Sequence, residues 1–105
     1  MEYINLTPHS INVRKVDGSS VIVPASGTIC RVSVTMQPSF VEDGIQVYAP
    51  VYGDIQNLPL PEEGKVFIVS RMIKDRCPDR ADVRVPGNLI RDEQGNVIGA
   101  EGLSL

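Results

Sequence analysis

Histidine, cysteine and tryptophan are scarce in this sequence, and that scarcity restricts its chemistry. The 105 residues include one histidine, His9, two cysteines, Cys30 and Cys77, and no tryptophan. A zinc site needs three or four His, Cys or carboxylate ligands, and no cluster with ligand spacing occurs. Nucleophile elbows and glycine-rich phosphate loops are missing as well. We therefore expect no metal site and no cofactor, and we assign no catalytic residue.

The two cysteines are far apart in the chain, and each lies among apolar residues. Free cysteine is among the most frequently buried residue types. We expect reduced, buried thiols at Cys30 and Cys77, with a disulfide or a reactive thiol as the alternative.

Long apolar runs and a basic leader are also absent. No segment approaches the roughly 18 apolar residues of a membrane helix, and the N-terminus lacks the basic start of a secretion signal. We expect a cytoplasmic protein without a membrane partner.

Basic residues are not in excess. Ten lysines and arginines stand against thirteen aspartates and glutamates, which gives a net charge of −3. Proteins that bind nucleic acid gain most of their affinity from neutralised phosphates and carry a basic surface. Nucleic acid is therefore an improbable partner, and the acidic excess is too small for a DNA mimic.

The balance of hydrophobic and charged residues, together with short alternating segments, predicts a single β domain over residues 1–105. Hydrophobic residues make up 42% of the chain and charged residues 22%, which is typical of a globular protein. Short alternating segments separated by turn residues indicate hairpins. We predict a mainly β fold, a small antiparallel β-barrel or rolled sheet with one short helix.

Alternation is clearest between Thr28 and Met36, which predicts a strand that ends at Gln37-Pro38. The residues of this strand expected to face the core are Cys30, Val32, Val34 and Met36. Asp17-Gly18 suits a two-residue hairpin turn, because both residues tolerate positive φ. The segment from Pro50 to Gly64 is rich in proline and glycine and predicts a long surface loop.

The second half of the chain is predicted in more detail. The uninterrupted apolar run Val66–Val69 indicates a central strand that is buried on both faces. Ser70 then caps a helix over Arg71–Arg76, which Pro78 ends. Val83 and Val85 should point inward on the next strand. Pro86-Gly87 fits a type II turn, and Asp92–Gly95 predicts the turn of a last hairpin.

A run of basic residues is the feature with most chemical content. It holds Arg71, Lys74, Arg76, Arg80, Arg84 and Arg91 within 21 positions. Arginine forks grip phosphate or carboxylate through paired hydrogen bonds. We therefore expect an anion site, with Arg71, Arg76, Arg80 and Arg84 as ligand-binding residues. The alternative is a surface ion-pair network, because Asp75, Asp79 and Asp82 are interleaved.

His9 is a further candidate for this anion site. It stands in Thr7-Pro8-His9, which predicts a tight turn in which Thr7 or His9 bonds the backbone. We expect the turn to meet the arginine segment, so that His9 contacts the same ligand.

Two tyrosines indicate a separate partner surface. Tyr48 and Tyr52 lie in the Tyr- and Pro-bearing segment from Tyr48 to Pro61, and tyrosine provides large contact area at little entropic cost. We expect them to anchor a protein partner, such as a host protein.

The two ends of the chain carry a resemblance to a known group. The segments concerned are Ile4–Ile11, Phe67–Ser70, Arg80–Val83, Val85–Gly87 and Ile90–Gly99. They are similar to small proteins of bacteriophages and prophages that have an N-L-T-P-H motif near the N-terminus. The resemblance covers about the first 12 and last 40 residues. It implies a phage setting, in the host cytoplasm, where small proteins often counter host defence.

We conclude from the sequence that the protein is a small non-catalytic binding protein. The first interpretation is a nucleotide-like anionic ligand; a protein–protein or structural phage accessory role is the second. A small enzyme with His9 as acid or base is the third. We also expect a homo-oligomer, because sheet edges in a small β protein need cover.

Overall fold

The computed structural model describes every residue from 1 to 105, in eight strands and one short helix. Six strands form one sheet in the order β1-β6-β7-β8-β2-β3, and β4 and β5 form a separate hairpin. The elements are β1 (Glu2–Asn5), β2 (Ile11–Arg14), β3 (Ser20–Val23), β4 (Arg31–Glu42), β5 (Ile45–Gln56), β6 (Lys65–Ile68), α1 (Arg71–Arg76), β7 (Val83–Arg91) and β8 (Val97–Ser104). The protein is mainly β, as predicted.

The six-stranded sheet curls until its two outer strands almost meet. A bridge between Asn5 and Ala25 joins the end of β1 to the segment after β3. Ser26 N–H also donates to the carbonyl oxygen of Asn5 at 3.0 Å. Since these contacts replace a full ladder, the sheet is nearly closed into a barrel.

The sheet is mixed, whereas the sequence predicts an antiparallel one. β1 with β6, β6 with β7 and β2 with β8 are parallel pairs. Only β2 with β3 and β7 with β8 are antiparallel. A parallel pair needs a crossover connection, and α1 lies in the crossover from β6 to β7. Alternation of side chains is the same in both kinds of pair, so it does not reveal the direction.

The core lies around β6, and the prediction that this strand is buried on both faces is confirmed. Val66, Phe67, Ile68 and Val69 are each at most 5% exposed. The main core cluster comprises Leu6, Cys30, Phe67, Val69, Ile73, Val83 and Val85. The strand is an interior one, between β1 and β7, but not the middle of the sheet.

The helix begins and ends where the sequence predicts, at Arg71 and Arg76. Ser70 occupies the N-cap position in an extended conformation but makes no side-chain capping bond. Val83 and Val85 are buried as expected. Asp92 accepts the amides of Gln94 and Asn96 at 2.9 Å, which closes the predicted last turn.

The turn predicted at Pro86-Gly87 is wrong, because β7 continues through both residues. Gly87 lies where the two strands approach closely: a Cβ there would stand 2.1 Å from the carbonyl oxygen of Glu101. Glycine at this position therefore allows the main chains of β7 and β8 to approach closely, and it does not mark a turn.

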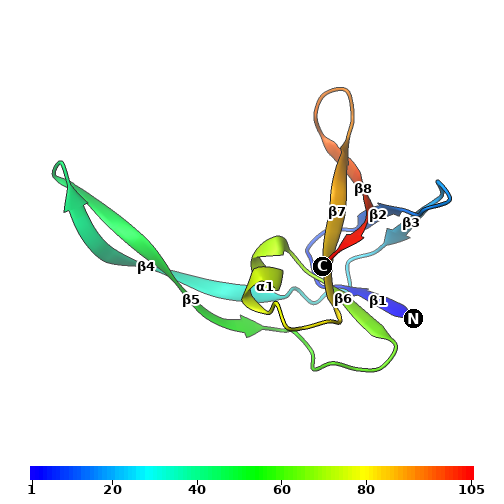
Figure 1. Ribbon diagram of the computed structural model, residues 1–105, viewed down its shortest axis with the longest axis horizontal. Helices are drawn as coiled ribbons and strands as arrows, with labels where there is room; N and C mark the ends of the chain where they lie inside the picture. Colours follow the sequence, from blue (N-terminus) through cyan, green and yellow to red (C-terminus); the bar gives the residue numbers. More distant parts are fainter.

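The hairpin of β4 and β5, which we name the arm, projects from the barrel (Figure 1). It extends along the longest axis of the molecule, which measures 55 × 39 × 23 Å (Figure 1). Its tip is Asp43-Gly44, with φ of 50° and 75°. Positive φ at both residues is the two-residue turn whose twist matches a hairpin. By contrast, Asp17-Gly18 lies in a longer loop between Arg14 and Ser20.

The arm corrects two predictions. The strand from Thr28 does not stop at Gln37-Pro38, because β4 runs on to Glu42. The predicted loop from Pro50 is strand as far as Gln56, so only the residues from 57 to 64 connect β5 to β6. Proline lacks only an N–H donor, and an edge strand can do without one on its solvent side.

Candidate functional sites: an apolar arm and a basic cleft

One face of the arm carries a continuous set of apolar side chains. Directly paired residues of an antiparallel hairpin share a face. Three pairs of residues point to this face: Val34 with Tyr52, Met36 with Pro50, and Pro38 with Tyr48. The pairs between them point to the opposite face of the arm. The set that we name the Met36 face consists of Val34, Met36, Pro38, Tyr48, Pro50 and Tyr52.

The Met36 face begins at the core and continues into solvent. Val32 and Ile55, at the base of the arm, pack against the core cluster. Farther out, Val34 is 46% exposed and Met36 is 59% exposed. The alternation predicted for this strand is thus present, but the prediction that Val34 and Met36 face the core is wrong.

The shaft of the arm has no charged residue. None occurs from Val32 to Val41 or from Ile45 to Gly53. Phe40 and Val51, which point away from the Met36 face, are 55% and 44% exposed. Depletion of charge together with Tyr, Phe and Met is the composition of buried interface cores.

Both free edges of the arm contain a proline. The arm has two strands, so β4 and β5 each have one unpaired edge. Pro38 lies on β4 and Pro50 on β5. Because proline interrupts the row of donors along an edge, it opposes the addition of a further strand. The faces of the arm, in contrast to its edges, are not blocked in this way.

The predicted anchors Tyr48 and Tyr52 are residues of β5 and not of a loop. Tyr52 is engaged within the chain: the guanidinium carbon of Arg76 lies 3.7 Å from the centroid of its ring. This cation–π contact places α1 beside the base of the arm. Arg76 is thus bound to Tyr52, while Tyr48, farther out, is 51% exposed.

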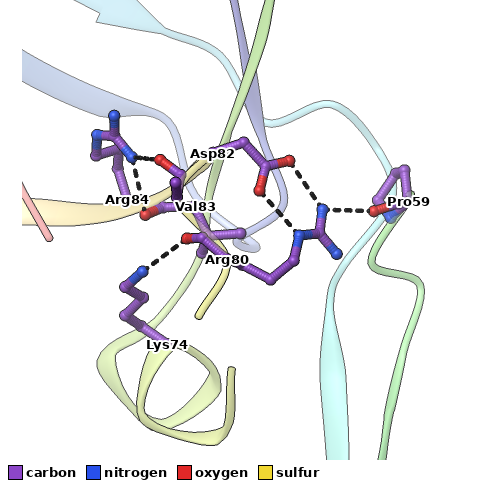
Figure 2. A network of polar contacts seen from close by, with 7 residues as sticks. Pro59, Lys74, Arg80, Asp82, Val83 and Arg84 are labelled. Atoms are coloured by element: carbon purple, nitrogen blue, oxygen red, sulfur yellow. Dashed lines mark hydrogen bonds and ion pairs between the residues drawn. The ribbon is translucent and has the colours of Figure 1, made fainter. Parts of the chain in front are cut away.

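Arg80 is occupied by an ion pair (Figure 2). Its Nε and Nη2 atoms donate to the two oxygens of Asp82 at 2.8 Å, and Nη2 also donates to Pro59 O at 2.8 Å. The hydrogen bonds from Arg80 are the main reason that the pKa of Asp82 lies below its usual range. Arg80 therefore ties the loop after β5 to the start of β7.

Arg71 and Arg84 differ from Arg80, because neither pairs with an Asp or Glu side chain. Arg84 Nη1 donates to the carbonyl oxygens of Ala81 and Val83, as Figure 2 shows in part. Arg71 Nη1 donates to Leu105 O at 3.0 Å. Both arginines line one cleft of about 600 Å³ between α1 and the start of β7.

Lys74 lines the same cleft and is almost buried, at 7% exposure. Its Nζ donates to Arg80 O at 2.9 Å. The two acidic residues of the cleft are Asp75 and Asp79. We name this site the basic cleft; its lining residues are Arg71, Lys74, Asp75, Pro78, Asp79, Ala81, Arg84 and Leu105.

His9 does not line the basic cleft. It is exposed, in the turn between β1 and β2. The predicted turn is present, and the single hydroxyl proton of Thr7 is shared between Asn5 Oδ1 at 2.6 Å and His9 O at 3.0 Å. Buried Asn5 completes the turn, since its Nδ2 donates to His9 O at 2.8 Å and to Val23 O at 3.0 Å.

Both cysteines are free. Cys30 is buried and Cys77 is half-buried, and desolvation raises the pKa of both thiols. No three His, Cys, Asp or Glu side chains are grouped to hold a metal ion. No helix has the length and apolar character needed to span a membrane.

Sequence reasoning missed the Met36 face and the burial of Lys74. The signals for the arm were the Asp43-Gly44 pair and the charge-free segments on both sides of it. No local signal exists for Lys74, whose burial depends on the packing of α1 against β7. The sequence prediction grouped four arginines as one site, and the structure brings only Arg71 and Arg84 together.

The chain matches no family model, no curated protein and no solved structure.

Proposed function

We propose that this protein is a non-catalytic binding module that assembles with further copies of itself through the arm. The observation that carries the proposal is the charge-free shaft, whose apolar side chains face solvent. A single two-stranded hairpin is at best marginally stable in water. The part of the arm beyond Val32 and Ile55 therefore needs a cover that the monomer does not supply.

The absence of charge favours a second copy over an unrelated partner. Transient partners are steered and selected by charged residues around their interfaces. The shaft itself has none, and Arg76 reaches the Met36 face only at its base, where it stacks on Tyr52. Apolar faces without charge are typical of obligate interfaces between identical chains. An apolar face is also complementary to itself, as a two-fold interface requires.

The size of the arm fits this role. The ten residues of β4 beyond Val32 rise about 33 Å, and a two-stranded ribbon is about 10 Å wide, so each face presents about 330 Å². Both faces together reach about 660 Å², close to the roughly 800 Å² that each partner of a standard interface buries. An assembly in which neighbouring copies pack on both faces of the arm would therefore have an interface of nearly standard size.

Substitution of the Met36 face tests the proposal. We expect the wild-type protein to have a mass that is a multiple of 11.5 kDa by light scattering after size-exclusion chromatography. The double variant Met36→Thr/Tyr48→Thr should shift it to the monomer. Threonine keeps β propensity while removing most of the apolar surface.

The matched control is Ile22→Thr/Val97→Thr, which changes two apolar residues of the barrel that are 66% and 52% exposed. It should retain the mass of the wild type. A wild-type protein that is monomeric at about 100 μM, a concentration that populates even weak complexes, would refute self-assembly. So would a Met36→Thr/Tyr48→Thr variant with an unchanged mass.

A further inference from the structure

The basic cleft is a second feature of the chain, separate from the arm. It lies between α1, the segment after α1 and the start of β7, and its volume is about 600 Å³. A volume of this size falls in the range of small-molecule sites. None of its lining residues belongs to the Met36 face, so the site is independent of the proposed assembly.

Two cations of the cleft, Lys74 and Arg84, lack a counter-charge. The ion pairs between side chains are Arg14 with Glu101, Lys65 with Glu62 and Arg80 with Asp82. Lys74 and Arg84 are thus more than 4.0 Å from any Asp or Glu carboxylate oxygen and donate to main-chain carbonyl oxygens, whereas Arg71 is already bonded to Leu105 O and Ser104 Oγ. A carbonyl oxygen satisfies a donor, but it does not neutralise a positive charge.

Lys74 is the strongest indication that the cleft binds an anion, because its ammonium group is nearly buried without a counter-charge. Its side chain is 7% exposed, and a buried charge is costly unless it is paired. The ammonium group has three donors, and one of them is used by Arg80 O. An anion in the cleft would supply the missing counter-charge and accept from the remaining donors.

The two aspartates of the cleft limit which class of anion can bind there. Asp75 and Asp79 lower the formal charge of the lining side chains from three positive to one positive. A polyanion would be repelled by them, whereas a hydroxyl group could donate to them. We propose that the basic cleft binds a small phosphate ester with free hydroxyl groups, such as a sugar phosphate or a nucleoside monophosphate.

In this arrangement the phosphate lies against Arg84 and near the ammonium of Lys74, and Arg71 borders the same cleft. Arginine forks match phosphate oxygens and form charge-assisted bonds. The hydroxyl groups of the ligand donate to Asp75 or Asp79. Arg76, Arg80 and His9, which the sequence had placed in the same site, take no part.

Calorimetric titration with four probes tests the proposal: inorganic phosphate, ribose 5-phosphate, adenosine 5′-monophosphate and uncharged ribose. We expect both phosphate esters to bind about tenfold more tightly than inorganic phosphate, because they add hydroxyl contacts. Ribose should not bind. If adenosine 5′-monophosphate binds more tightly than ribose 5-phosphate, the base also contacts the protein, and the ligand is a nucleoside monophosphate.

Variants of the cleft locate the binding. Arg84→Gln should weaken ribose 5-phosphate about tenfold or more, whereas the control Arg91→Gln, also on β7 but outside the cleft, should bind as the wild type does. Asp79→Asn should strengthen inorganic phosphate binding and reduce the preference for the ester. This gain of affinity cannot come from misfolding.

Two results would overturn the proposal. One is the absence of heat from every phosphate probe at about 10 mM, which would mean affinity weaker than any functional site. The other is equal binding by the wild type, Arg84→Gln and Asp79→Asn. Neither result depends on the mass of the assembly, so the two proposals fail separately.

Discussion

At the scale of single residues, the pair Arg80 and Asp82 is the main polar tie between the loop after β5 and the barrel. The two side chains are 21% and 18% exposed, and two bonds of 2.8 Å join them. Such bidentate, charge-assisted contacts with little solvent are stronger than surface pairs. They position Pro59 and, through it, the base of the arm.

Asp82→Asn should lower the free energy of unfolding by about 1–3 kcal/mol at pH 7, since it leaves the guanidinium group without its counter-ion. The folded-state pKa of Asp82 is depressed. Its contribution to stability is therefore full above the ordinary carboxyl pKa of about 3.9 and is lost as the pH falls through the depressed value. Urea unfolding at several pH values measures both effects.

Asp79→Asn is the matched control, because Asp79 has no ion pair. This variant should leave the free energy of unfolding at pH 7 nearly unchanged. If Asp82→Asn and the wild type lost stability in parallel between pH 5 and about pH 3, the tie would not depend on the charge of Asp82.

Asn5 is the second residue on which the closure of the barrel depends. It is 1% exposed, and besides its two donated bonds its Oδ1 accepts from Thr7 N at 2.9 Å and Thr7 Oγ1 at 2.6 Å. Asn5→Ala should cost about 2–3 kcal/mol in thermal or urea unfolding, because buried partners lose their bonds. Asn12→Ala, an exposed position on β2, should cost less than about 1 kcal/mol.

At the scale of elements, Gly87 shows why the β7–β8 pair has its particular sequence. A methyl group at Gly87 would collide with the main chain of Glu101, so the strands must separate to admit it. Gly87→Ala should destabilise the protein by about 1–3 kcal/mol. At Gly53 the nearest atom to a new Cβ is the hydroxyl oxygen of Ser33, which can rotate away.

Thermal unfolding of Gly87→Ala beside Gly53→Ala measures this difference. We expect the melting temperature of Gly53→Ala to stay near that of the wild type, since only a flexible side chain must move. A drop of equal size in both variants would show that the close approach of β7 to β8 has no special cost.

The sequence predicted those elements whose boundaries are set locally. The helix over Arg71–Arg76 follows from the spacing of its residues before Pro78, and the last turn follows from Asp92 and Gly95. The arm escaped prediction because Pro38 and Pro50 indicate loops in most contexts. Their effect depends on whether a neighbouring strand needs the missing N–H, and that is a property of the assembled sheet.

At the scale of the whole molecule, the sequence predicted a mainly β domain with one helix but not the direction of its strands. Parallel pairing joins segments that are distant in the chain, as in β1 with β6 and β2 with β8. Alternation of side chains records only which face is buried. The same limit applies to the basic cleft, where the tertiary fold selects Arg71 and Arg84 and directs Arg76 and Arg80 to other partners.

The place of β8 in the sheet has a consequence for the order in which the protein is made. β8 lies between β7 and β2, so the barrel cannot form until residues 97–104 have left the ribosome. The arm, residues 31–56, emerges well before them. During translation the arm therefore lacks the barrel against which its base packs, and its edge prolines oppose strand pairing between nascent chains. In the proposed self-assembly, arms would pack together only after each chain is complete.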